Sequence, residues 1–453
     1  GAASYISTTT GARIVTYIPH KGNIELLCDR IDAWVDLQYM NNSDKLISLI
    51  YYNYPPGKQN IGSSYLDTIT SIYNMLHTLE NAGYDVGELP SNVSELENLM
   101  LECGINVATW APGELEKLAN QSNVVLLPVS EYNEWFETLP EIVKIQVKEG
   151  PIPYIGELAK RAVELEYTVT FGDTITDWYN QIVALLPDDK AVEATRILDD
   201  IVASLKNYTA TFDEKYFNMF LEHYEEFKEL DVEGLTGWGE CPGNVMVVKK
   251  NGVDYFVIPG LKFGNVYIAP EPQRGWESDI ENLYHCTAVA PTHQYLAAYY
   301  YMQTYYPNGM VFVGRHATHE WLPGKEILLS STDYGSIVVG KTPQLYFYIS
   351  DGLGEAIQAK RRGFAVILSH LTSPLSYTQL YGNLTVAANL IEDYLNSNDQ
   401  TLKDEIAEEI RNLIIDNDYS MNLGLTKEDV KILSSDELLK KVDSFLKSTQ
   451  CTI

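Results

Sequence analysis

The chain has few cysteines and no long apolar run. It carries five cysteines among 453 residues, and no two of them are spaced as Cys-x-x-Cys. This sparse, odd number predicts neither a disulfide framework nor a zinc ribbon, and it favours a reducing, cytoplasmic compartment. No apolar stretch approaches the ~18 residues that would indicate a transmembrane helix. The sequence therefore predicts a globular protein with no membrane span.

Positive charge is also scarce. The 32 Lys and Arg residues face 62 Asp and Glu residues, which leaves a formal net charge of −30. Such a field repels the phosphates of nucleic acid and anionic lipid, so the sequence argues against nucleic acid as a partner. The chain does not begin with Met and has Asn-x-Ser/Thr sequons such as that at Asn92. These two features leave a secreted or surface-associated form open.

A phosphate-binding loop is missing as well. The sequences Pro56-Gly-Lys58 and Pro323-Gly-Lys325 lack both the upstream glycine and the following Ser or Thr of a P-loop. Any ATP hydrolysis on which this protein depends must therefore come from another chain.

The pattern that is present is typical of an α/β protein. A β-rich apolar run at residues 45–53 leads into a Pro-Pro-Gly loop, and residues 66–82 then repeat apolar side chains at helical spacing. This order indicates a multi-domain α/β fold with short parallel or mixed sheets flanked by helices. The expected parts are an N-terminal segment leading into the first domain (1–46), an α/β domain with a helical insertion (47–232), an α/β domain carrying a His/Glu site (233–375) and a helical C-terminal region (376–453).

The strongest candidate site is the segment 314–325, Gly-Arg-His-Ala-Thr-His-Glu-Trp-Leu-Pro-Gly-Lys. It follows a predicted strand at residues 310–313, and open α/β sheets bind ligands beyond the carboxyl ends of their strands. In a helix, His316 would lie three residues from His319 and four from Glu320, within reach of one divalent cation. The alternative is a pair of buried, hydrogen-bonded histidines beside a helix cap.

Further candidates are spread between residues 285 and 370. His285 and His293 flank a Pro-containing turn, and His370 follows a predicted strand, although single histidines of this kind are more often structural. Residues 351–362 join an acidic glycine-rich turn to a cationic cluster, a combination that suits a substrate with carboxylates. The alternative there is an N-capped helix with a solvated basic end. The residues concerned are Glu355, Lys360, Arg361 and Arg362.

Several longer motifs follow one another along the chain. They are Tyr52-Asn-Tyr-Pro-Pro-Gly-Lys58 with Asn60-Ile-Gly62 and Tyr65-Leu-Asp67, Trp238-Gly-Glu-Cys-Pro-Gly243, Pro259-Gly-Leu-Lys-Phe-Gly-Asn-Val266, Pro291-Thr-His-Gln-Tyr-Leu-Ala297, the segment 314–325, and Gly354-Glu-Ala-Ile-Gln-Ala-Lys-Arg-Arg362 with His370-Leu-Thr-Ser-Pro374. In this order they resemble the large subunit of the cobaltochelatase and magnesium-chelatase family. Trp321-Leu-Pro-Gly-Lys325 is more similar to the cobalt branch than to the magnesium branch.

The resemblance implies a subunit that holds a tetrapyrrole and a divalent metal, while separate AAA+ ATPase subunits drive metal insertion. It favours Co²⁺ and a corrin-type ring, with Mg²⁺ and Ni²⁺ as the other candidate ions. Family members are much longer, so the chain is expected to be their central part. The expected catalytic residues are Glu320, His316, His293 and Glu355; the expected metal ligands are His316, His319 and Glu320; the expected substrate-binding residues are Trp238, Trp321, His285, His370, Lys360, Arg361 and Arg362.

Two departures from the family pattern keep alternatives open. Phe312 stands where the family usually has the first histidine of His-x-Gly-x-His-Gly, and Cys286 stands where Asp is common. The second hypothesis is therefore a divergent, non-catalytic tetrapyrrole-binding homologue. A third is a zinc hydrolase that uses His316, His319 and Glu320.

Overall fold

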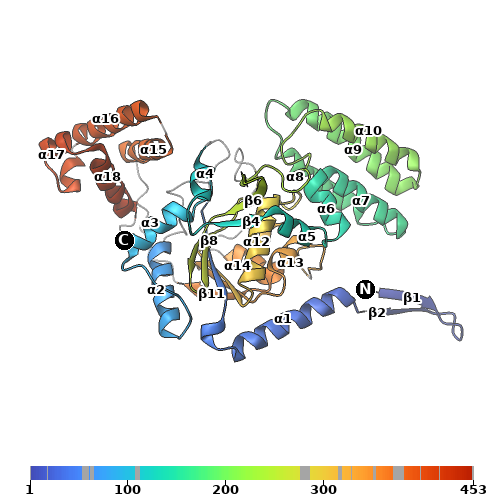
Figure 1. The fold of residues 1–453 in the computed structure, drawn as a ribbon. Coiled ribbons are helices and arrows are strands. Elements are labelled where there is room, and N and C mark those ends of the chain that lie inside the picture. Colours follow the sequence, from blue (N-terminus) through green and yellow to red (C-terminus); the bar gives the residue numbers. More distant parts are fainter. Residues whose placement is uncertain are drawn as a thin grey trace. The chain divides into compact units, whose positions relative to one another are not determined.

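The structure is a computed structural model of the chain. It describes residues 2–17, 19–53, 61, 66–107, 113–275, 286–314, 319–327, 329–349, 353–370, 382–397, 399–417 and 419–450. The chain forms two compact units, one of Gly1–Pro56 with Gly62–Ser369 and one of Gly57–Ile61 with His370–Ile453. Figure 1 shows the elements of both units along the chain.

The larger unit is built on a six-stranded sheet in the order β11-β10-β9-β3-β8-β7. The neighbours β10, β9, β3 and β8 are parallel, whereas β7 is antiparallel to β8. Every residue of β3 is buried, as expected for a parallel strand covered on both faces. The strands are β3 (Ile47–Tyr51), β7 (Leu261–Phe263), β8 (Val266–Pro270), β9 (Gly309–Val313), β10 (Gln344–Ile349) and β11 (Val366–His370).

A second, smaller sheet has the antiparallel order β4-β6-β5. It consists of β4 (Val125–Pro128), β6 (Val253–Ile258) and β5 (Val247–Lys250). The hydroxyl of Tyr267 in β8 donates to the carbonyl of Pro259, 2.9 Å away, directly after β6. This bond ties the end of the small sheet to the large one.

Helices connect the strands of the larger unit. Two of them begin at side chains that cap the first turn: Asp67 accepts from the amide of Thr70 at 3.0 Å, and Thr292 accepts from the amide of Tyr295 at 3.1 Å. The helices around the sheets are α2 (Thr68–Asn81), α3 (Val93–Cys103), α4 (Glu114–Ala119), α5 (Val129–Phe136), α6 (Glu141–Glu149), α12 (His293–Tyr305), α13 (Tyr334–Val339) and α14 (Leu353–Gly363), with the short 3-10 helices η1 (Asn42–Asp44) and η2 (His319–Trp321).

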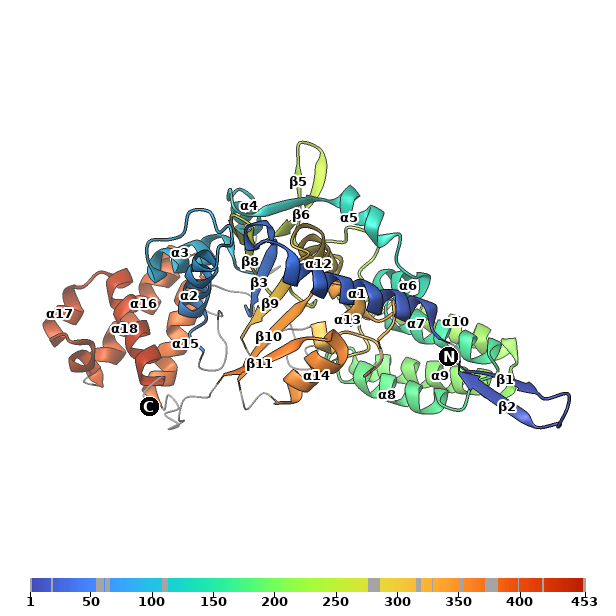
Figure 2. The ribbon, with the colours of Figure 1, turned by 90° about the horizontal axis from the view of Figure 1, so that it is seen from below.

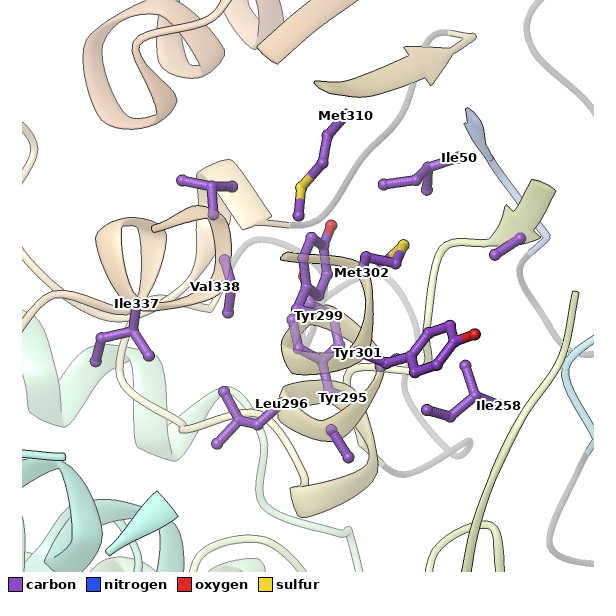
Figure 3. Packing of buried hydrophobic residues seen from close by; sticks show 14 of the residues in the cluster. Ile50, Ile258, Tyr295, Leu296, Tyr299, Tyr301, Met302, Met310, Ile337 and Val338 are labelled. Carbon is purple, nitrogen blue, oxygen red and sulfur yellow. The ribbon is translucent and has the colours of Figure 1, made fainter. Parts of the chain in front are cut away.

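Helix α12 lies in the core of this unit. All its residues from His293 to Tyr299 are buried, which is typical of a helix enclosed on every side. Figure 3 shows Met302 of α12 in the same cluster as Ile50 of β3 and Met310 of β9, with Val338 of α13 nearby. The core thus joins α12 to strands that are distant in sequence.

A helical bundle forms the insertion between β4 and β5. Helices α7 (Pro151–Glu164), α8 (Phe171–Val183), α9 (Ala191–Thr211) and α10 (Glu214–Lys228) pack on one another, as Figure 2 shows in a second view. Their buried side chains include Ile155, Ile175, Ile201 and Phe220 and recur at helical spacing. This spacing is typical of helices that bury one face against their neighbours.

The N-terminal residues form a hairpin of β1 (Ala2–Ile6) and β2 (Arg13–Tyr17), followed by α1 (Lys21–Tyr39). Apolar side chains of α1 are exposed: Ile24 is 47% and Leu27 is 53% exposed. Arg30 contacts the rest of the unit, because its Nε donates to the carbonyl of Gly340 at 3.0 Å. No residue of α1 is buried, so this helix does not enter the core.

The smaller unit is helical. Residues such as Ile391, Ile410, Val430 and Val442 make its own buried apolar cluster. Arg411 donates to the carbonyl of Leu433 at 3.1 Å and so fixes the end of α17. The elements are α15 (Asn383–Asn396), α16 (Gln400–Asp416), η3 (Tyr419–Leu423), α17 (Lys427–Ile432) and α18 (Ser435–Gln450).

The predicted fold class is confirmed: short mixed and parallel sheets are flanked by helices, and the C-terminal part is helical. The six-stranded sheet takes β3 from the predicted part 47–232 and its other strands from the part 233–375, with β11 at its edge. Within the residues that the structure describes, no helix is long and apolar enough to cross a membrane.

Candidate functional site

The candidate site lies at the carboxyl edge of the parallel strands. Tyr51 at the end of β3 pairs with Pro270 of β8 on one side and with Val313 of β9 on the other. The three strands therefore end at the same edge, where open α/β sheets bind ligands. The segment 314–325 follows β9 directly, so the strongest sequence candidate begins at this edge.

The structure describes the predicted site residues unevenly. His285 and His316 lie outside the described residues. For Glu320 and His370 the structure describes the backbone only, in η2 and at the end of β11. Their assignments stay predictions.

A layer of buried polar groups lies at the ends of β3 and β8. The amide of Asn106 donates to Oδ1 of Asn53 at 2.8 Å, and its side-chain nitrogen donates to the carbonyls of Asn53 at 3.0 Å and Glu271 at 2.8 Å. All three residues are at most 3% exposed. Such bonds are needed here because an unbonded buried polar group is costly.

Glu271, the first residue after β8, is a buried carboxylate. The hydroxyl of Tyr299 donates to its two oxygens at 2.9 and 2.7 Å, and the hydroxyl of Tyr295 donates to Oε1 at 3.0 Å. Burial, and then the charge of Glu271, raises the pKa of Tyr299 well above its usual value. Tyr299 therefore remains a protonated donor, and together with Tyr295 it holds the carboxylate against α12.

His319 is completely buried at the start of η2. Its ring stacks on Phe312 of β9 with 4.5 Å between centroids and an interplanar angle of 19°. Burial lowers its pKa to about 3, so the imidazole is neutral. Gly363 makes room for it, because a Cβ there would lie 3.0 Å from Nε2 of His319. A neutral imidazole can bind a metal, but this ring packs inside the fold.

His293 is the first residue of α12 and is 1% exposed. Its Nε2 lies 3.1 Å from the carbonyl of Gly239, and its Nδ1 lies 3.0 Å from the hydroxyl of Tyr132. A carbonyl can only accept, so Nε2 carries the proton and Nδ1 accepts from the tyrosine. Burial lowers the pKa of His293 to about 4. Both ring nitrogens are thus engaged in joining α12 to α5 and to the loop at 238–243.

Trp238 anchors the same loop. Its indole nitrogen donates to the carbonyl of Ala290 at 2.8 Å, and its amide donates to the carbonyl of Val147 at 2.8 Å. The partly buried ring packs against both apolar clusters of the larger unit. These contacts join the bundle to the segment before α12.

Asp333 holds the turn after η2 through two hydrogen bonds from Lys325. Asp333 accepts from the amide of Lys325 at 2.9 Å and also from its ammonium group. Burial raises the pKa of Asp333, but the bonds from Lys325 and Ser330 outweigh it and leave the pKa below its usual value. Gly324 permits this contact, because it has φ of +130° and a Cβ would lie 2.6 Å from Oδ1 of Asp333.

Two buried arginines complete the turn. Arg362, at the end of α14, donates from Nε to the carbonyl of Lys325 at 3.0 Å and from a terminal nitrogen to that of Leu322 at 2.6 Å. Arg274, in the loop after β8, donates to the carbonyl of Cys286 at 2.9 Å and, at 3.5 Å, reaches that of Trp321. Both arginines are 3% exposed.

The remaining predicted residues are more exposed than His293 and His319. Trp321 ends η2 and is partly buried, and Glu355 is partly buried in the first turn of α14. Lys360 and Arg361 are exposed on the same helix. The cationic cluster is therefore divided, because Arg362 turns to the interior while its two neighbours face solvent.

No group of three or more His, Cys, Asp or Glu side chains that could hold a metal ion occurs within the described ranges. Of the predicted metal ligands, His316 lies outside the described residues, and Glu320 is described in its backbone only. Of this set, the structure describes only the side chain of His319, and it packs on Phe312.

Sequence reasoning missed Glu271 and Arg274. A signal was present, since Ala269-Pro-Glu-Pro-Gln-Arg274 places a carboxylate and a guanidinium directly after an apolar strand. The carboxyl end of such a strand is where functional groups are expected in an α/β sheet. The edge thus combines buried carboxylate, imidazole, amide and guanidinium groups, which can fix loops and orient a ligand placed above them.

Comparisons with known proteins agree with the motifs. The family model described as CobN/Magnesium Chelatase matches residues 2–161 and 158–452. An uncharacterized protein of Methanocaldococcus jannaschii is 27% identical over 87% of this chain and 24% of its own length. The aerobic cobaltochelatase subunit CobN of a Sinorhizobium species is 24% identical over 98% of the chain and 27% of its own length.

Two further matches are a magnesium-chelatase subunit and a solved structure. A magnesium-chelatase subunit of Rhodobacter capsulatus is 25% identical over 81% of this chain and 22% of its own length. The solved catalytic subunit of cobaltochelatase from Mycobacterium tuberculosis has a TM-score of 0.50 and 22% identity, over 98% of this chain and 30% of that one. The chain thus spans about a quarter of the curated relatives it matches. Because the family model covers nearly the whole sequence, the chain belongs to the CobN/magnesium chelatase family.

Proposed function

We propose that this chain is the tetrapyrrole- and metal-binding core of the large subunit of an ATP-dependent chelatase. The observation that carries the proposal is that two of its motifs, 52–58 and 314–325, begin at one edge of the sheet. The segments after β3, β8 and β9 begin side by side, above a buried polar layer that includes Asn53 and Glu271. The expected substrates are a corrin-type ring and Co²⁺, with Mg²⁺ and Ni²⁺ as the other ions.

Metal insertion needs a base, because the two ring N–H groups must lose their protons as the metal–nitrogen bonds form. Glu320 and His316 are the proposed acceptors, since carboxylate and imidazole can be tuned toward neutral pKa by burial. The divalent ion is a substrate that His316, His319 and Glu320 would present to the ring. Buried groups below the edge, such as Glu271, keep the loops in place while this happens.

The partners follow from the same proposal. The chain has no P-loop, so ATP hydrolysis is assigned to separate AAA+ subunits. The relatives whose names call them chelatase subunits support a complex of several chains. We place this complex in the cytoplasm, because the sparse, unpaired spacing of the cysteines favours a reducing compartment.

One observation favours a second candidate function, a non-catalytic tetrapyrrole-binding homologue. Phe312 occupies the position where the family usually has a histidine, and its ring fills the space beside His319. An apolar ring there can neither bind a metal nor move a proton. The same edge could then hold a ring without inserting an ion.

A titration followed by an insertion assay tests the proposal. We expect the visible absorption of a metal-free corrin-type ring to shift on addition of the chain, and a metal-free porphyrin to shift less. With Co²⁺, ATP and the AAA+ subunits, the spectrum of the metallated ring should appear. Glu320→Ala should reduce that rate at least about 100-fold, in the range expected for loss of a general base.

The control is Glu326→Ala, which removes an exposed carboxylate from the same loop and should leave the rate unchanged. No absorption change with either ring would refute tetrapyrrole binding and with it both candidate functions. Binding without insertion by the unaltered chain would favour the non-catalytic homologue.

A further inference from the structure

The backbone of residues 319–325 is held by two arginines that come from different elements. Arg362 projects from the last turn of α14 and donates to the carbonyls of Leu322 and Lys325, at 2.6 and 3.0 Å. Arg274 projects from the loop after β8 and reaches the carbonyl of Trp321 at 3.5 Å. The turn that follows the predicted ligands is thus bonded to two guanidinium groups.

These bonds select one arrangement of the turn. Both arginines are 3% exposed, and a buried guanidinium that loses a hydrogen-bond partner incurs a large desolvation cost. Its donors form a rigid planar fork, so the carbonyls must sit where the fork points. A shift of the turn by an ångström would break bonds that water could not replace there.

Arg274 also connects the turn to a third segment. Its guanidinium donates to the carbonyl of Cys286 at 2.9 Å and reaches that of Val289 at 3.5 Å, both shortly before α12. The loop after β8 is itself fixed by Glu271, which Tyr295 and Tyr299 of α12 hold. The turn, the loop and the start of α12 are therefore joined by one set of hydrogen bonds.

We propose that Arg274 and Arg362 are positioning residues, which fix the backbone of residues 319–325 so that the ring and the ion meet a preformed site. Arg362 then acts on the substrate through the turn, and its role differs from the carboxylate-binding role expected from its place in the cationic cluster. This inference rests on the proposed function, since the site that the turn serves is the chelatase site. It assigns the contact with ring carboxylates to the exposed Lys360 and Arg361.

The experiment compares Arg362→Gln, Arg362→Lys and Arg274→Gln with the unaltered chain. Two quantities are measured: the dissociation constant for a metal-free corrin-type ring, by visible absorption, and the hydrogen exchange of the backbone amides at 319–327. We expect Arg362→Gln to raise both, the dissociation constant at least about 10-fold. Arg362→Lys should give intermediate values, because one ammonium can keep one of the two carbonyls. Arg274→Gln should have a smaller effect, because its bond to the turn is longer.

The matched control is Arg411→Gln. Arg411 also donates to backbone carbonyls, those of Val430 and Leu433, but it belongs to the helical unit. This variant should raise exchange near α17 and leave both ring binding and exchange at 319–327 unchanged. It shows how much the loss of arginine–carbonyl hydrogen bonds far from the turn changes ring binding and hydrogen exchange.

The outcomes separate this inference from the proposed function. If the unaltered chain binds no ring, the chelatase proposal fails. If Arg362→Gln leaves hydrogen exchange at 319–327 unchanged, Arg362 does not fix the backbone of the turn and this inference is overturned. If exchange rises there while ring binding stays within twofold, the positioning role is wrong and the chelatase proposal stands. If ring binding weakens with exchange unchanged, Arg362 contacts the ring directly and the inference is again overturned.

Discussion

The helical bundle α7–α10 and the carboxyl edge of the six-stranded sheet are buried in opposite ways. In the bundle, side chains such as Ile201 and Leu205 are fully enclosed, and charged groups such as Arg196 stay on the surface. At the edge, Glu271 and Arg274 in the loop after β8 are as deeply buried as the apolar core. Both regions lie in the same compact unit. The difference therefore lies in the kind of residue that each region buries.

The comparison separates stability from geometry. Burying apolar area is favourable wherever it happens, and small shifts of the bundle change little as long as the area stays covered. Burying Glu271 or Arg274 costs desolvation and is tolerated only while each keeps its bonded partners. The edge therefore fixes positions, at some expense of stability, and polar burial of this kind is expected at functional sites.

Ile201→Ala is the prediction with the largest effect on stability. The substitution leaves a cavity in α9, where Ile201 is fully buried, and should lower the free energy of unfolding by about 2–5 kcal/mol. Urea denaturation followed by circular dichroism measures this. Ring binding by the folded protein should be unchanged; weaker binding at full folding would show that bundle and edge are not independent.

A smaller effect is expected from His293→Gln, and it depends on pH. The pKa of His293 is lowered to about 4 by burial, against about 6.5 in an unfolded chain. Between these values the unfolded chain binds a proton that the folded chain does not, so stability falls as the pH falls. Tyr132, Gly239, Lys148 and Glu240 are the groups around this ring.

The measurement is the free energy of unfolding of both proteins from pH 8 to pH 4. The unaltered chain should lose up to about 1.4 kcal/mol more per pH unit than the variant, below pH 6.5 only. Above pH 7 the two curves should run parallel. Parallel curves throughout would mean that His293 is protonated as readily in the folded protein as in the unfolded chain.

The smallest effect is expected from Arg196→Ala on the surface of the bundle. Arg196 pairs with Glu193 at 2.9 Å and Asp200 at 3.3 Å, and its side chain is 48% exposed. Solvent screens such pairs, so the urea midpoint should not change measurably. A clear loss of stability, greater at low salt than at high salt, would show that surface charges of the bundle matter as much as its core.

Much of the fold could be predicted from local patterns. The helical spacing at 66–82 and the strand at 310–313 appear as α2 and β9. The apolar stretch Asn123-Val-Val-Leu-Leu-Pro-Val129 contains β4, which lies in the small antiparallel sheet with β6 and β5. The apolar residues of this stretch indicate that it is buried. They do not indicate which strand it pairs with, because strand pairing depends on segments far away in sequence.

The sequence predicted that the segment 314–325 follows a strand, and that strand is β9. The motif after β9 and the histidines were identified from residue type, and their roles as ligand or base stay predictions. The signal for Glu271 and Arg274 was weaker, since a carboxylate and a guanidinium in a loop are usually solvated. The sequence Lys360-Arg-Arg362 does not indicate that Arg362 is buried while Lys360 and Arg361 are exposed.

By itself the sequence determined the α/β class, the helices, the family and the strand that leads to the site, because periodicity and motif identity are local properties of the chain. Only the tertiary structure decided that β3 lies between β8 and β9, and that Arg362 bonds to carbonyls of the turn. A guanidinium accepts carboxylate or carbonyl partners alike, and the choice depends on which oxygens the folded chain brings to within about 3 Å.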